Sequence, residues 1–225
     1  MCFCFRTFDF NQTVIVNQAI RGSAEWLQSR CGLVTASRIN DVLATIKSGE
    51  AATRASYRSQ LVAERLSGKP AESFTNAAMQ WGTETEPFAR AAYELETGFM
   101  VDQVGLIRHA EIVFSGASPD GLINDDGLIE IKCPETKTHI EYALAGKAPS
   151  KYQNQMLWQM ECTGRQWCDF ASFDPRMPSD MQLFIVRFER DQARIDTIKS
   201  EVIKFLAEVE DSINRLRSIF KKEIK

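Results

Sequence analysis

The stretch that decides the fold runs from Ser118 to Pro134 and reads SPDGLINDDGLIEIKCP. Side chains alternate across a β-strand, so Glu130 and Lys132 share one face while Ile129 and Ile131 occupy the other. The residues at 124–127, NDDG, are typical of a hairpin turn between two short strands. We therefore expect a hairpin with one apolar face that packs into a core and one face that carries charge.

The turn also predicts which residues meet across this hairpin. A loop of residues 125–127, with Gly127 in the left-handed conformation that such loops favour, fixes the register of the two strands. Asp120, Glu130 and Lys132 then lie on the same face of the hairpin. The expected pairs are Asn124 with Leu128, Leu122 with Glu130, and Asp120 with Lys132.

Two carboxylates on one face of a short hairpin indicate a cation site. Asp120 and Glu130 would repel each other without a positive charge between them, and oxygen-only ligation suits Mg²⁺ or Mn²⁺. A lysine such as Lys132 beside that site can orient or activate a water and stabilise charge on a phosphate. The simpler alternative is an exposed hairpin with solvated charges. The upstream SPD and the apolar reverse face favour the metal site.

Composition limits the class of protein. The 225 residues, 44% of them hydrophobic and 25% charged, show no linker and no repeat, which predicts a single domain over 1–225. The net charge of −3 gives no general attraction to nucleic acid, but local Lys and Arg contacts are not excluded by it.

Arg6 and Asp9 interrupt the apolar N-terminal run, and no window is long enough to span a membrane. The six cysteines lack zinc-ligand spacing, so we expect reduced thiols in a cytosolic protein.

Periodicity predicts an α+β domain with a central mixed β-sheet flanked by helices. Pro87 predicts a kink or a new first turn inside one helix. A variable arm covers about 1–22, and a long amphipathic helix at about 191–221 either packs on its own core or joins a subunit contact. Further helices are expected at 24–29, from 35 or 37 to 43, 54–66, 77–96 and 152–162, and strands at 101–108, 112–117, 122–123, 128–132, 167–173 and 182–188.

Several segments give the chain a family resemblance. SPD followed by a turn and EIK resembles the PD-(D/E)xK nuclease core, and the wider pattern resembles the phage lambda exonuclease family and its viral recombination relatives. The resemblance implies a restriction-endonuclease-like core. It covers roughly 26–190, although the arm before Trp26 does not match. The segments, in the family's order, are WLQSRCGLVTAS (26–37), MQWGTETE (79–86), SPDGL (118–122), LIEIKCP (128–134), KYQNQMLWQM (151–160) and FDPRM (173–177).

The resemblance implies catalytic roles for residues of the hairpin and a helix. Asp120, Glu130 and the main-chain carbonyl of Ile131 would hold two Mg²⁺ ions, for which Mn²⁺ would substitute. Glu86 would complete the acidic site, and Lys132 would position or activate the attacking water.

The resemblance also implies contacts to the DNA. Gln155 would assist near the scissile phosphate, and Arg30, Ser37 and Ser118 would receive the 5′-phosphate of the cut strand. Met79 would insert as an apolar wedge between the terminal bases. Other roles stay open for these residues: a solvated helix charge for Glu86, Gln153 or Gln159 in place of Gln155, an ion pair of Arg30 with Glu25, a helix cap for Ser37, and a core position for Met79.

Together these features predict an Mg²⁺-dependent 5′→3′ exonuclease that digests one strand of duplex DNA to mononucleotides and leaves a 3′ single-stranded tail. The family resemblance implies a ring of three subunits around DNA and a phage single-strand annealing protein as partner. It also implies a phage or prophage gene and the host cytoplasm as the location. The alternatives are an endonuclease of the restriction or junction-resolving kind and a non-catalytic DNA-binding module of the same fold.

Overall fold

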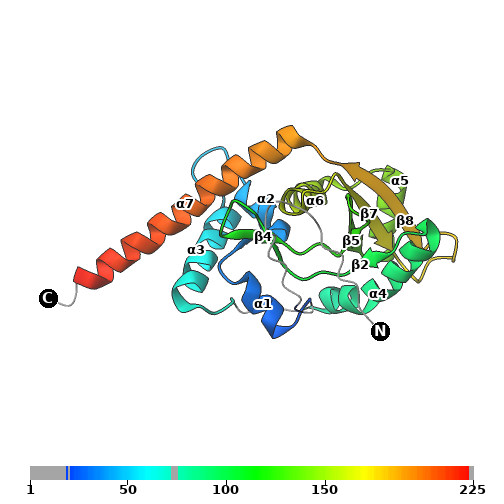
Figure 1. Cartoon of the computed structure of the whole chain (residues 1–225), viewed down its shortest axis with the longest axis horizontal. Coiled ribbons are helices and arrows are strands. Elements are labelled where there is room, and N and C mark those ends of the chain that lie inside the picture. The colour runs from blue at the N-terminus through cyan, green and yellow to red at the C-terminus, as the bar shows by residue number, and fades with distance from the viewer. Residues whose placement is uncertain (1–18, 20, 72–75, 223–225) are drawn as a thin grey trace.

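The computed structural model describes residues 19, 21–71 and 76–222 and is organised around a five-stranded mixed sheet (Figure 1). The parallel pair β6–β7 lies at its centre, and the remaining neighbours are antiparallel. This confirms the predicted central mixed sheet. The strands, in spatial order, are β2 (Val101–Asp102), β5 (Gly121–Ile123), β6 (Gly127–Lys132), β7 (Trp167–Phe173) and β8 (Leu183–Glu189).

A second, three-stranded sheet was not predicted. It consists of β1 (Val34–Thr35), β4 (Ser115–Ala117) and β3 (Ile107–Arg108) in that spatial order. The single strand expected at 101–108 is wrong, because β2 pairs with β5 in the large sheet and β3 pairs with β4 in the small one. Gly105 lies in the connection, where its low strand propensity favours the change of direction between the sheets.

Most helices begin and end where their capping residues predict. The Ser23 side chain accepts a hydrogen bond from the Trp26 N–H, and left-handed Gly68 and Gly98 end two helices. The helix expected up to residue 43 divides into η1 and α2, and the helix α5 was not predicted. The helices are α1 (Ala24–Arg30), η1 (Ala36–Arg38), α2 (Ile39–Val42), α3 (Ala52–Ser67), α4 (Ala77–Thr97), α5 (Thr136–Ala145), α6 (Ser150–Thr163) and α7 (Gln192–Lys222).

Pro87 does not divide α4, which continues through it as one helix of 21 residues. Proline removes the N–H that would bond the carbonyl four residues earlier, at Thr83. Both residues are exposed, so water can satisfy that carbonyl. The expectation of a new first turn at this position is therefore wrong.

The central hairpin has a different register from the predicted one. The loop comprises residues 124–126, and the left-handed residue is Asn124, with φ of 47°, rather than Gly127. Gly127 serves another purpose, because a Cβ there would collide with the indole of Trp167. The shift is two residues, so every side chain keeps its predicted face. The observed pairs are Ile123 with Gly127, Leu122 with Leu128, and Gly121 with Ile129.

Both faces of β6 are buried, which rules out the solvated hairpin. Ile129 and Ile131 belong to an apolar cluster with Ala89 and Tyr93 of α4. On the other face Glu130 is fully buried beneath α6. The charged face therefore points into the protein, where its charges need partners.

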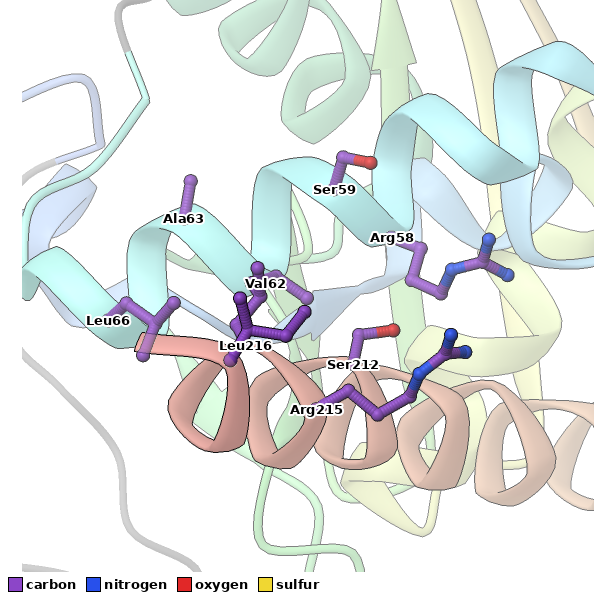
Figure 2. A pocket seen from close by; sticks show the side chains of 9 residues that line it. Arg58, Ser59, Val62, Ala63, Leu66, Ser212, Arg215 and Leu216 are labelled. Atoms are coloured by element: carbon purple, nitrogen blue, oxygen red, sulfur yellow. The ribbon is translucent and has the colours of Figure 1, made fainter. Parts of the chain in front are cut away.

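Helix α7 packs on the core of its own chain, which is the first of the two alternatives predicted for it. Phe205 stacks on Tyr57 of α3, with ring centroids 5.5 Å apart. Toward its C-terminus, α7 passes α3 along a cavity of about 540 Å³ that Leu66 and Ile219 help to line (Figure 2). The fully or almost fully buried residues of α7 are Ile195, Ile198, Val202, Phe205, Val209 and Ile213.

Two further predictions concern the chain as a whole. Within the described ranges, no helix is long and apolar enough to cross a membrane. Cys31, Cys133, Cys162 and Cys168 are free thiols, which fits the predicted reduced state. Cys2, Cys4 and most of the N-terminal arm lie outside the described residues.

Replacing Phe205 with Ala tests the packing of α7. The change should lower the free energy of unfolding by about 3–5 kcal/mol, because it removes a buried ring and leaves a cavity. Urea denaturation measures this, with the exposed Ile203→Ala on the same helix as the control. Equally small losses for both variants would mean that α7 does not depend on this core.

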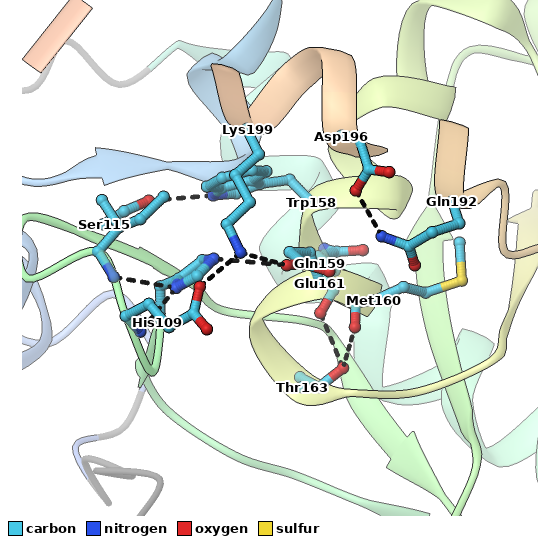
Figure 3. Close-up of polar contacts among 12 residues, drawn as sticks. His109, Ser115, Trp158, Gln159, Met160, Glu161, Thr163, Gln192, Asp196 and Lys199 are labelled. Carbon is cyan, nitrogen blue, oxygen red and sulfur yellow. Dashed lines mark hydrogen bonds and ion pairs between the residues drawn. The ribbon is translucent and has the colours of Figure 1, made fainter. Parts of the chain in front are cut away.

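A charged network joins α6 to the β3–β4 connection and to α7 (Figure 3). The His109 Nδ1 accepts from the backbone N–H groups of Glu111 and Ile112, so neutral His109 carries its proton on Nε2, which lies 3.7 Å from Glu161 Oε1. Lys199 Nζ lies 3.5 Å from the same oxygen, and Arg190 pairs with the other. His109 chiefly, and then Arg190 and Lys199, hold the pKa of Glu161 at about 2 despite partial burial.

The low pKa of Glu161 predicts a stability that depends on pH. Because the folded-state pKa of about 2 lies below the ordinary 4.5, the stabilising contribution is complete above about pH 4.5 and is lost as pH falls toward 2. Glu161→Gln should therefore lower the Tm most at neutral pH and progressively less at acidic pH. Thermal melts from pH 3 to 7 measure this difference, with the exposed Glu141→Gln as a control. A Tm difference that does not change with pH would contradict the prediction.

Candidate active site

The catalytic candidates of the hairpin meet α6 at Glu130. Its Oε1 accepts hydrogen bonds from Lys132 Nζ and, at 2.5 Å, from Gln155 Nε2. Its Oε2 accepts from Gln159 Nε2 at 2.7 Å. Burial would raise the pKa of Glu130, but the charge and hydrogen bond of Lys132, with the bond from Gln159, keep that pKa below its ordinary value. The buried carboxylate is therefore ionised at neutral pH.

The other two acids, Asp120 and Glu86, both lie beside the side chain of Arg21. The Asp120 Oδ2 accepts from the Ile131 N–H at 2.6 Å, while its buried Oδ1 has no hydrogen-bond partner among the described residues and forms an ion pair with Arg21. The same Arg21 Nη1 lies 3.6 Å from Glu86 Oε2, and Glu86 also accepts from Arg90 at 2.8 Å. One guanidinium thus contacts both the hairpin acid and the α4 acid.

The donor set fits a divalent cation. Within the described ranges, no three Asp, Glu, His or Cys side chains form a group that could hold a metal ion as they stand; Arg21 contacts two of the acids and Lys132 contacts the third. The buried Asp120 Oδ1 nevertheless faces positive charge without a hydrogen bond, and carboxylate oxygens are the ligands that Mg²⁺ and Mn²⁺ prefer. Ile131 contributes its N–H to Asp120, and ligation by its carbonyl stays a prediction.

A cationic pocket lies beside the acidic site. Arg30, in the last turn of α1, donates to Ser118 Oγ at 3.2 Å, to Thr35 Oγ1 at 3.2 Å and to Ser37 Oγ at 3.3 Å. Its guanidinium also lies 4.2 Å from the centre of the Trp26 ring. Burial lowers the pKa of Arg30 to about 10, so the side chain is still charged at neutral pH. The three residues predicted to bind a phosphate are therefore together.

This pocket opens into a cavity of about 430 Å³, which Arg30, Ser37 and Met79 help to line. Met79 is 53% exposed, which excludes the alternative of a core position. Ser37 bonds Arg30 rather than capping a helix, and the described hydrogen bonds of Arg30 go to hydroxyl groups rather than to Glu25.

Several residues of the site were not assigned from the sequence. Trp26 donates from its indole N–H to Ser118 Oγ at 3.2 Å, and its position four residues before Arg30 on α1 was a usable signal. Tyr152 lies with its ring centre 5.1 Å from Lys132 Nζ. Gln159 was only an alternative to Gln155, yet both reach Glu130. Arg21 lies in the arm, where no pattern indicated it.

The fold and the site define a class of protein. A mixed sheet whose central hairpin presents Asp120, Glu130 and Lys132, with Glu86 supplied by a helix, is the arrangement of a nuclease with a restriction-endonuclease-like fold. Residues 25–166, more than half of the chain, match the family described as the YqaJ-like viral recombinase domain. The chain belongs to this family.

Solved structures agree with this assignment. The chain is 52% identical to an alkaline exonuclease, LHK-Exo, from Laribacter hongkongensis, with a TM-score of 0.82 over 89% of this chain and 99% of that one. The same protein in complex with dAMP gives a TM-score of 0.83 at the same identity and coverage. A phage-related exonuclease from Haemophilus somnus 129PT, 18% identical with a TM-score of 0.66 over 82% of this chain and 96% of that one, shares the fold. No curated protein matches the chain significantly. Fold and family together make the chain a DNA exonuclease.

Proposed function

We propose that the chain is an Mg²⁺-dependent exonuclease that digests one strand of duplex DNA in the 5′→3′ direction from a 5′-phosphorylated end. It releases mononucleotides and leaves a 3′ single-stranded tail for phage recombination. The observation that carries this proposal is the position of Ser118. Its hydroxyl accepts from Arg30 of the cationic pocket, and it lies two residues before Asp120 of the acidic site, so one short segment joins the two.

Asp120, Glu130, Glu86 and the carbonyl of Ile131 would hold two divalent ions, Mg²⁺ or Mn²⁺. When bound, these ions supply an activated water and stabilise the leaving oxygen. Lys132 provides a positive charge beside Glu130, where it can hold a water and balance charge on the scissile phosphate.

Gln155 and the cationic pocket would bind and orient the substrate strand. The Gln155 amide already donates to Glu130, so it can orient that carboxylate and would lie close to a phosphate bound there. Arg30 offers a planar fork of N–H donors that suits a terminal phosphate, with Ser37 and Ser118 beside it. Met79, exposed on the cavity wall, would wedge between the terminal bases.

The assembly and the partner are proposals that rest on the family likeness. A ring of three subunits around DNA would hold the substrate by enclosure, which suits a chain with a net charge of −3. A phage single-strand annealing protein would then take up the 3′ tail in the cytoplasm of the host cell. The mass of the protein in solution, with and without duplex DNA, tests the ring.

Digestion of three substrates tests the proposed direction and end requirement. In Mg²⁺, the enzyme should degrade a 5′-phosphorylated linear duplex fastest, a 5′-hydroxyl duplex more slowly and a closed circle not at all. Asp120→Ala should abolish digestion while leaving DNA binding intact, because the acid holds a metal rather than the strand. Equal cutting of the circle would establish the endonuclease alternative. Digestion that survives Asp120→Ala would reject these carboxylates as the hydrolytic site.

Replacing Arg30 with Lys tests the phosphate pocket. The lysine keeps the charge but loses the guanidinium fork, so kcat/KM on the 5′-phosphorylated duplex should fall about 10- to 100-fold. The rate on the 5′-hydroxyl duplex should change little, because that substrate offers no terminal phosphate. Arg217→Lys, at an exposed position of α7, is the matched control. An equal loss on both substrates would show that Arg30 does not read the terminal phosphate.

A further inference from the structure

Helix α6 presents two glutamines to the same carboxylate. Gln155 and Gln159 are one helical turn apart, so both side chains lie on the face of α6 that covers β6. Gln155 has an expected role near the scissile phosphate, whereas no role has been assigned to Gln159. Gln159 is nevertheless fully buried, whereas Gln155 is only partly buried.

The orientation of the Gln159 amide follows from its partner. The Gln159 amide donates its N–H to Glu130 Oε2, at 2.7 Å. The Gln159 Oε1 is then buried and, among the described residues, has no partner. A buried acceptor without a partner is unfavourable, so what the amide contributes at this position is its hydrogen bond to Glu130. The glutamine therefore fits a requirement of the site better than a requirement of the core.

The two oxygens of Glu130 have separate environments. Oε1 lies on the accessible side, where it contacts Lys132, whose side chain is 23% exposed, and Gln155. Oε2 lies on the interior side, where Gln159 is its only hydrogen-bond donor among the described residues. The terminal torsion of a glutamate is soft and nearly two-fold, so the carboxylate can rotate unless both ends are held.

We propose that Gln159 is a positioning residue for Glu130, which holds Oε2 in the interior so that Oε1 alone is presented to a divalent cation and to Lys132. This inference rests on the proposed Mg²⁺-dependent function. It assigns Gln159 to the second layer of contacts around a metal ligand, where hydrogen bonds orient the ligand without touching the ion.

Gln159→Met tests the inference, because methionine keeps the volume and removes the donor. In the full-length protein without DNA, the Kd for Mg²⁺ measured by calorimetry should rise about 10- to 100-fold. The Mg²⁺ concentration for half-maximal digestion should rise in parallel, while KM for DNA stays within about two-fold because Gln159 is buried away from the strand. Gln153→Met is the matched control, since Gln153 lies on the same helix and donates to the Ala148 carbonyl at 2.9 Å instead.

Two further variants separate positioning from folding. Gln159→His places an imidazole N–H at a similar reach and should recover most of the Mg²⁺ affinity. Gln159→Asn keeps an amide on a side chain that is shorter by one methylene, so it should weaken Mg²⁺ binding. This variant replaces Gln159→Met in the test if the Met variant does not fold. The Tm of each variant is measured in EDTA. Because EDTA removes bound Mg²⁺, this Tm reports the folding of the metal-free protein alone.

The outcomes are distinguishable. A Kd for Mg²⁺ in Gln159→Met or Gln159→Asn equal to that of Gln153→Met would overturn the inference, even if the Tm fell, because the role would then be structural. A wild-type protein that neither binds Mg²⁺ nor requires it for digestion would instead overturn the proposed function, and the premise of this inference with it.

Discussion

The ionised, fully buried Glu130 is the constraint on which the rest of the site depends. A lone carboxylate in a protein interior is strongly unfavourable, and three donors, from Lys132, Gln155 and Gln159, offset that cost. Two of those donors come from α6, so α6 must lie over β6 at one particular height. Buried Trp158 and Met156 of the same helix fix that height by their packing in the main core. The core around α6 is therefore also the support of the acidic site.

The local distribution of charge explains how an acidic chain can hold a phosphodiester. Ser118 accepts from Arg30 and from Trp26, while Asp120, two residues later, belongs to the acidic site. The hydroxyl that accepts from the cationic Arg30 thus lies only two residues before an acid of the site. The overall charge of −3 has no bearing on that short-range arrangement.

The sequence predicted the acidic site because its strongest signal has a period of two. The turn was misplaced, with Gly127 rather than Asn124 in the left-handed conformation, yet a two-residue shift keeps Asp120, Glu130 and Lys132 on one face. The sequence was less informative about strand pairing and side-chain contacts between segments that are far apart in the chain. Nothing local to 101–108 says that two short strands join different sheets, and nothing in the arm indicates that Arg21 reaches Asp120. The family likeness supplied the distant members of the pocket, such as Arg30, which no local pattern links to Ser118.

The contacts of Arg21 show that Asp120 and Glu86 share one positive partner even without a bound metal ion. Asp120 directly precedes β5 and Glu86 lies in α4, and like charges brought together repel. They lie together here because a guanidinium contacts both. The Arg21 side chain is 41% exposed, whereas the Asp120 side chain is only 1% exposed, so the loss of Arg21 would leave a buried carboxylate without a positive partner. The two acids therefore require a positive charge beside them, and in this structure the Arg21 guanidinium supplies it.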